Sequence, residues 1–311
     1  MIRNHTIYFL LSIGMLSGCS QIIEIDIPEH EPKLVLNGFI IAGDDDTISQ
    51  TYHFDSYTNV FTVSRSASAM ERNDNVIYYE DAQVEIYENG NLVEVIPEAT
   101  DESQGWGRET IHYYIPGYIY QPGNTYEIRT SHHDKPDEIR AVQALPAKPQ
   151  VYDISVRQQQ QNEIISFTFD DPPGPNQYLI KVYAANQGSL FQVFFNVIDG
   201  GYSPLSFFEE FNPEGGEQYT HQGIIVDDDF DGRSKTIEIR HPEFDNMGQD
   251  LDFFVHFISI TKDMQRYLRS YYLKVATEGN PFAEPTQIFF NVEGNGYGSV
   301  TGGTRTIFKA E

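Results

Sequence analysis

A short acidic segment near residue 230 has the residue pattern of a calcium-binding loop. The sequence DDDFDGRSKTIE, residues 227–238, matches that pattern at each specified position. Calcium prefers several hard oxygen ligands, and the pattern supplies alternating carboxylates, a backbone carbonyl and a closing glutamate. The predicted ligands are the side chains of Asp227, Asp229, Asp231 and Glu238 and the carbonyl of Arg233.

The same segment also has the composition of a plain turn. The flanking sequences GIIV and TIEIR have strand character, whereas a calcium loop of this type lies between two helices. Arg233 and Lys235 place positive charge inside the loop, and Asp and Gly favour tight turns. A hairpin turn is therefore the alternative to calcium, and no other cofactor is indicated.

His132-His133-Asp134 is a second group of side chains that can bind metals. Adjacent residues of a strand point to opposite faces, so two neighbouring histidines rarely bind one ion. An exposed polar turn is the simpler interpretation. The sequence contains no zinc-protease, serine-hydrolase or phosphate-loop motif, so we expect a protein that is not an enzyme.

Aromatic residues are frequent between residues 106 and 120. Exposed faces of Trp106, Tyr113 and Tyr118 would stack on sugars or anchor a protein partner. In a β-rich protein most such rings belong to the core instead, which is the competing interpretation.

The chain contains one cysteine, and the N-terminal sequence explains it. An apolar run over residues 7–16 follows a positively charged start and is too short to span a bilayer comfortably. The run ends in the pattern of a lipobox, in which two small residues precede the cysteine. Its residues are Leu16, Ser17, Gly18 and Cys19.

We expect cleavage before Cys19 and lipidation of its thiol. This gives a signal peptide over 1–18 and a lipidated tether over 19–32, with a membrane as partner through the N-terminal lipid. The formal net charge of −26 repels phosphate backbones, so nucleic acid is not an expected partner. It would also repel an anionic bilayer, which favours attachment by lipid rather than by a basic patch.

Composition and turn signals predict a mainly β protein. Aromatic residues are numerous, with 20 Tyr and 21 Phe, and they alternate with turns rich in Gly and Pro. Asn89-Gly90 is a hairpin signal, and residues 144–149 form a proline-containing linker. We therefore predict two β-sandwich-like domains, over 33–147 and 148–311.

Two further hairpins and one helix are predicted in the second domain. Strands over 163–170 and 177–184 would pair around a proline-rich turn, and 224–226 would pair with 236–240. A C-terminal amphipathic helix is predicted near 261–277, with Thr261 as its cap and Gly279 at its end.

Several stretches, in this order, resemble the domain of unknown function 4249 family, outer-membrane-type lipoproteins common in Bacteroidetes. They are LVLNGFI, PGNTYEIR, QYLIKVY, DDDFDG, ISITKDMQRYLRSYY and NPFAEPTQIFFNVEGNGYGSVTG. The resemblance implies a lipid-anchored β-protein of the outer membrane and suggests partnership with a TonB-dependent receptor barrel. It brings no known activity and no known catalytic residues.

The leading functional hypothesis is a non-enzymatic, lipid-anchored outer-membrane binding protein that assists a TonB-dependent receptor in nutrient uptake. The first alternative is an independent surface lipoprotein that binds carbohydrate or another ligand. The least favoured alternative is a hydrolase that uses some of the many acids. The periplasmic and surface faces of the membrane are both left open.

Overall fold

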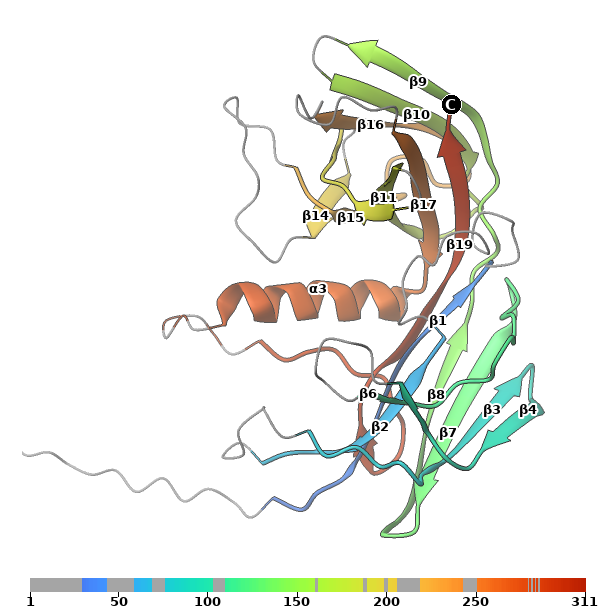
Figure 1. Ribbon diagram of the computed structural model, residues 1–311, viewed down its shortest axis with the longest axis vertical. Helices are drawn as coiled ribbons and strands as arrows, with labels where there is room; N and C mark the ends of the chain where they lie inside the picture. The colour runs from blue at the N-terminus through green and yellow to red at the C-terminus, as the bar shows by residue number, and fades with distance from the viewer. Residues whose placement is uncertain are drawn as a thin grey trace, which may run out of the picture. The chain divides into compact units, whose positions relative to one another are not determined.

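The computed structural model describes residues 30–43, 59–68, 76–102, 110–159, 162–186, 189–198, 201–205, 219–242, 251–278, 280, 282, 284 and 286–311. Residues Pro32–Glu311 form one compact unit. Within the described ranges the unit is mainly β, with several sheets and a single helix near the C-terminus (Figure 1). The predicted fold class is confirmed.

A nine-stranded sheet extends through the whole unit. Its order is β14-β15-β11-β17-β19-β1-β18, with β12 paired to β11 and β2 paired to β1. The strands are β1 (Leu34–Ala42), β2 (Phe61–Arg65), β11 (Gln177–Asn186), β12 (Ser189–Gln192), β14 (Tyr202–Leu205), β15 (Gln222–Val226), β17 (Asp252–Ile260), β18 (Gly296–Tyr297) and β19 (Val300–Ala310). Although β1 and β19 come from opposite ends of the chain, they lie side by side and are parallel.

Two four-stranded sheets and one small ribbon complete the β-structure. The first sheet has the order β4-β3-β7-β8, from β3 (Gln83–Glu88), β4 (Asn91–Ile96), β7 (Thr125–His132) and β8 (Lys135–Ala144). The second has the order β13-β16-β10-β9, from β9 (Val151–Gln159), β10 (Asn162–Asp170), β13 (Asn196–Val197) and β16 (Ser234–Pro242). The ribbon pairs β5 (Thr100–Glu102) with β6 (Thr110–His112).

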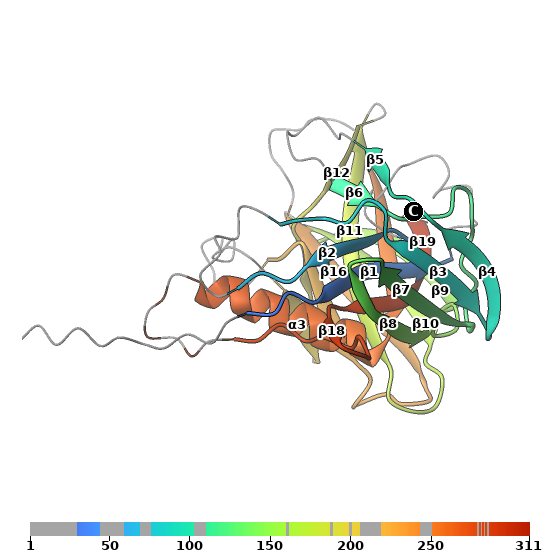
Figure 2. The same ribbon diagram turned by 90° about the horizontal axis from the view of Figure 1, so that it is seen from below.

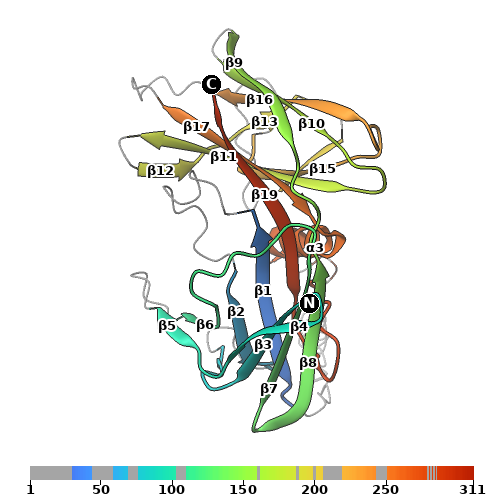
Figure 3. The same cartoon turned by 90° about the vertical axis from the view of Figure 1, so that its right-hand side faces the viewer.

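Each four-stranded sheet packs on a different half of the nine-stranded sheet. One core joins β1 and β2 to β3, β7 and β8, and a second core joins β11 and β17 to β10 and β16. The long strand β19 contributes to both cores, since Val300 lies in the first and Phe308 in the second (Figure 3). These two residues are an even number of positions apart and therefore point to the same face of the strand.

The proline-containing linker crosses the nine-stranded sheet between the two smaller sheets. The Thr304 hydroxyl donates to the Pro146 carbonyl at 2.6 Å, and the Thr306 hydroxyl donates to the Pro149 carbonyl at 2.8 Å. The division expected after residue 147 thus separates the two smaller sheets. It does not divide the nine-stranded sheet, which takes strands from both sides of that boundary.

The helix α3 (Lys262–Thr277) covers the opposite face of the nine-stranded sheet. Its Met264, Leu268 and Tyr272 are buried against residues of β11, β15 and β17. The Thr261 hydroxyl caps the helix by accepting from the Met264 amide at 3.2 Å. The predicted helix and its Thr261 cap are confirmed, because an apolar stripe at helical spacing has an apolar sheet face to cover. Gly279, predicted at the helix end, lies outside the described residues.

Of the three predicted hairpins, one is confirmed and two are wrong. Strands β3 and β4 pair around Asn89 and Gly90, which both have the positive φ that this turn requires. By contrast, β10 and β11 lie in different sheets, and so do β15 and β16. The turns after Asp170 and Val226 are crossovers between the two layers of the second sandwich. Alternation of apolar residues marks a strand but does not identify its partner.

Candidate functional site

The acidic segment forms the crossover from β15 to β16, and its carboxylates accept hydrogen bonds from the crossover between β10 and β11. The Asp231 carboxylate accepts from the Gly174 amide at 2.8 Å, and the Asp227 carboxylate accepts from the Asn176 amide at 2.6 Å. In the reverse direction, Asp171 accepts from the Gly232 amide at 2.9 Å. Three carboxylates therefore join two crossovers that are distant in sequence.

Asp171 is the most constrained of the three carboxylates. It is buried, and it also accepts from the Tyr178 hydroxyl at 2.5 Å. Burial raises the pKa of the Asp171 carboxyl, and the neighbouring charges of Asp227 and Asp231 raise it further. No sequence pattern points to Asp171, because only the crossover topology brings it to the acidic segment.

The predicted set of five calcium ligands is not assembled. Glu238 lies within β16, and its carboxylate pairs with the Arg157 guanidinium on β9 at 2.8 Å. The Arg233 carbonyl accepts from the Asp171 amide at 3.2 Å, and Asp229 is exposed. Because the segment leads into a strand rather than a helix, it does not wrap around one point. The carboxylates that do converge are those of Asp171, Asp227 and Asp231, whose closest oxygens lie within 4.8 Å of one another.

The two adjacent histidines lie together, contrary to the expectation for a regular strand. The pairing of β7 with β8 is irregular between Thr130 and His132, and both imidazoles reach Asp81. His132 is buried; its Nε2 lies 3.0 Å from an Asp81 oxygen, and its Nδ1 accepts from the Asp134 amide at 3.2 Å. Both nitrogens of His132 therefore have partners within the protein, which indicates a structural hydrogen-bond arrangement.

Of the three predicted aromatic contact residues, the structure places two. Tyr113 is fully buried; its hydroxyl donates to the Tyr79 carbonyl at 2.7 Å and accepts from the Ala82 amide at 2.9 Å. It is a core residue and offers no face to a sugar. Tyr118 is half-buried against the first core. Trp106 lies outside the described residues, as do the lipobox residues Leu16, Ser17, Gly18 and Cys19.

The comparison with protein families agrees with the fold and with the ordered stretches of sequence. The family described as a domain of unknown function, DUF4249, matches residues 21–307. The chain belongs to this family. The resemblance stated from the sequence is thus confirmed over nearly the whole chain after Cys19. Comparison with curated proteins gives no match.

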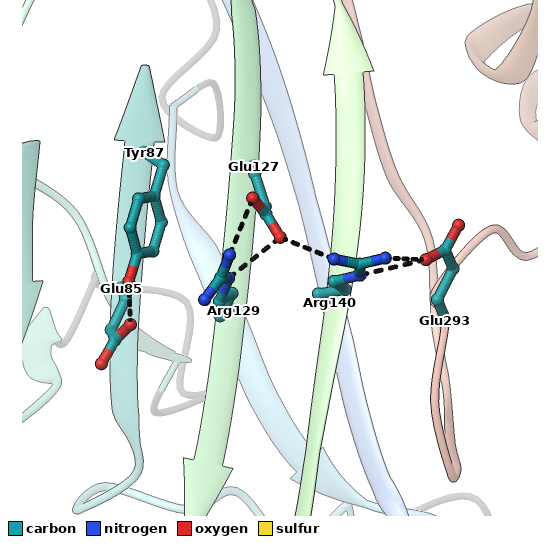
Figure 4. Close-up of polar contacts among 6 residues, drawn as sticks. All are labelled: Glu85, Tyr87, Glu127, Arg129, Arg140 and Glu293. Atoms are coloured by element: carbon teal, nitrogen blue, oxygen red, sulfur yellow. Dashed lines mark hydrogen bonds and ion pairs between the residues drawn. The ribbon is translucent and has the colours of Figure 1, made fainter. Parts of the chain in front are cut away.

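In this DUF4249 member, the outer face of the sheet β4-β3-β7-β8 carries a row of charges that neutralise one another (Figure 4). Arg129 and Arg140 lie directly opposite on β7 and β8, an arrangement that costs energy for like charges. Glu127 accepts from both, at 2.9 and 3.3 Å, and Arg140 also pairs with Glu293 at 2.9 Å. Each guanidinium therefore has a carboxylate partner. The pair between Arg140 and Glu293 attaches the C-terminal segment to this face, and neither arginine is left as an unpaired charge for a ligand.

The fold also bears on whether a helix of this protein could cross a membrane. Within the part of the chain that the structure describes, no helix has the length and apolar character needed to cross a bilayer.

Proposed function

We propose that this protein is a lipid-anchored binding protein of the outer membrane that works without catalysis as the accessory partner of a TonB-dependent receptor. The observation that carries the proposal is the position of the family match, which starts at residue 21, two residues after the lipobox cysteine. The family match thus covers most of the chain that would remain after cleavage before Cys19. A lipid at that cysteine would hold the whole module at a membrane.

The receptor as partner rests on the family and not on a residue of this chain. The two groups of His, Asp or Glu close enough to share a metal, Asp81-His132-His133 and Asp171-Asp227-Asp231, already accept or donate hydrogen bonds within the fold.

Two measurements test the proposal separately. Mass spectrometry of the N-terminal peptide would show lipid on Cys19 in the native protein, and the Cys19→Ser variant would remain unprocessed. Affinity purification of the tagged protein from mildly solubilised envelopes would then recover a TonB-dependent barrel in stoichiometric amount. An unmodified Cys19 would overturn the anchor, and purification of lipidated protein without a barrel would overturn the partnership.

Independent capture of a carbohydrate or other ligand is the second candidate. Its support from aromatic residues is reduced, since Tyr113 belongs to the core. Binding on glycan arrays that Trp106→Ala abolishes would favour this candidate over the accessory role.

Calcium binding remains a separate proposal with a smaller set of ligands. Asp171, Asp227 and Asp231 can place three carboxylate oxygens around one ion. Calorimetric titration with calcium, after the protein has been treated with a chelator and the chelator removed, tests this proposal. The Asp231→Asn variant is expected to lose binding. A titration without heat of binding would remove calcium from the function.

A further inference from the structure

The exposed face of α3 is basic in a protein that is otherwise strongly acidic. The helix carries four of the chain's 20 Lys and Arg residues within sixteen positions, with Asp263 as its single acid. Lys262, Arg266 and Arg269 follow one another at spacings of four and three residues and therefore lie on one face of the helix. All three are exposed, on the side opposite to the buried Met264 and Leu268. Figures 1 and 2 both show α3, in orange, beside the strands that it packs against.

These cations differ from those of the β-sheet surface in having no carboxylate partner among the described residues. Arg129, Arg140 and Arg157 each form an ion pair. Arg266 instead lies over the ring of Phe289, 5.5 Å from its centroid. The acid of the helix is engaged elsewhere, because Asp263 accepts from the side-chain amides of Asn291 and Gln143. Within the part of the chain that the structure describes, no ion pair neutralises Lys262, Arg266 or Arg269.

Exposed aromatic side chains continue this basic face toward the start of the folded chain. Next to Phe289, Phe290 is 43% exposed, and its ring lies 6.1 Å from that of Tyr297, which is 41% exposed. Lys33 lies over the Tyr297 ring at 5.5 Å. Ring contacts and the peptide link between Phe289 and Phe290 thus connect α3 with Lys33, the second residue of the compact unit.

We propose that this surface, made of Lys262, Arg266, Arg269, Phe290, Tyr297 and Lys33, binds an anionic phospholipid surface. Cations attract the headgroup phosphates, and aromatic rings favour the boundary between headgroups and acyl chains. The net charge of −26 would repel such a membrane, so a local basic face is what permits one orientation of the protein against it.

A membrane is favoured over an acidic protein by the position of Lys33, an argument that rests on the proposed lipid anchor. The thirteen residues from Cys19 to Glu31 span at most about 45 Å when fully extended. The tether therefore keeps Lys33 and the basic face that adjoins it within reach of the bilayer. An acidic partner protein would gain no such proximity from the lipid.

The test uses residues 20–311, without the signal peptide and without Cys19, so that binding comes neither from a lipid nor from the apolar run over residues 7–16. Its sedimentation is measured with vesicles of phosphatidylcholine alone and of phosphatidylcholine mixed with phosphatidylserine. We expect binding to the mixed vesicles only, weakened by salt. Arg266→Gln with Arg269→Gln should lower the partition coefficient about 25-fold, since each cation near an anionic surface contributes about fivefold.

A matched control removes two cations from the sheet β13-β16-β10-β9. Arg157→Gln with Lys235→Gln changes the net charge equally and should leave vesicle binding unchanged, with circular dichroism showing that both double variants are folded. Equal binding by the two double variants, or no binding of the parent chain to mixed vesicles, would overturn the proposal. Because the parent chain carries no lipid, its result is independent of whether Cys19 is lipidated in the native protein.

Discussion

The Asp171 carboxylate accepts a hydrogen bond from the Gly232 amide at 2.9 Å, although 61 residues separate them in sequence. This contact joins the crossover from β10 to β11 with the crossover from β15 to β16. Both crossovers pass between the same two layers, so the contact fixes the end of the second sandwich. The acidic segment therefore has a structural role in the fold.

Replacing Asp171 by Ala is expected to destabilise the protein by about 3 kcal/mol. The change leaves the buried Tyr178 hydroxyl and the partly buried Gly232 amide without their acceptor, and an unpaired buried donor costs about 1–3 kcal/mol. Urea unfolding followed by circular dichroism measures the effect. The matched control is Asp229→Ala in the same acidic segment, where an exposed side chain should change the free energy of unfolding by less than about 0.5 kcal/mol. Equal effects of the two substitutions would contradict the structural role of Asp171.

Asp171 also predicts a pH dependence with an unusual sign for a carboxylate. Its pKa is raised by burial, so the folded state binds this proton more tightly than the unfolded state does. The contribution of Asp171 to stability therefore increases as the pH falls through its folded pKa toward the ordinary value of 3.8, and is constant below it. The quantity to measure is the difference in unfolding free energy between the native protein and Asp171→Asn at several pH values. It should shift in favour of the native protein on acidification; a shift in the opposite direction would show that the folded pKa is not raised.

Asp81 is expected to show the opposite behaviour. The hydrogen bond with His132 is the main cause that lowers the pKa of the Asp81 carboxyl below its ordinary value. The stability that Asp81 contributes is present above pH 3.8 and is lost as the pH falls through the lower folded value.

Carboxyl NMR titration tests this assignment with two neighbouring histidines. His132→Gln should return the pKa of Asp81 toward its ordinary value, whereas His133→Gln should change it little, because His133 is the smallest of the causes and is exposed. A larger shift in the His133 variant would mean that charge, not the hydrogen bond, sets the pKa of Asp81.

Tyr126→Phe is expected to cost about 2 kcal/mol in the first sandwich. The buried Tyr126 hydroxyl accepts from the Gln121 amide at 2.7 Å and donates to Glu88 at 2.5 Å, so its removal breaks two bonds. The hydrogen bond from Tyr126 to Glu88 is also the main cause that lowers the pKa of the Glu88 carboxyl. The pKa of Glu88 should therefore rise in the Tyr126→Phe variant. Chemical denaturation measures the first effect, and carboxyl NMR measures the second.

The control for this prediction is Tyr87→Phe, which removes a single hydroxyl on the outer face of the same sheet, bonded to Glu85 at 2.7 Å. Its cost should be below about 1 kcal/mol, because water can replace the lost partner. If Tyr87→Phe were the more damaging change, the bonds of Tyr126 would not support the first sandwich as described.

The sequence by itself determined the features that depend on neighbouring residues. Asn89-Gly90 predicted its hairpin because that turn needs positive φ at both positions. Met264, Leu268 and Tyr272 predicted α3 because their spacing places them on one helix face. The ordered stretches of sequence also predicted the family that matches residues 21–307.

Only the tertiary structure decided which strands and side chains meet. Local alternation cannot tell that β15 and β16 belong to different sheets, so a hairpin was expected where a crossover occurs. For the same reason Asp171 at the acidic segment and Asp81 beside His132 could not be predicted, since each contact joins residues more than fifty positions apart. Net charge gave a single value for the whole chain. Among the described residues, the separation of that charge into ion pairs on the sheets and cations without such a pair on α3 exists only once the chain is folded.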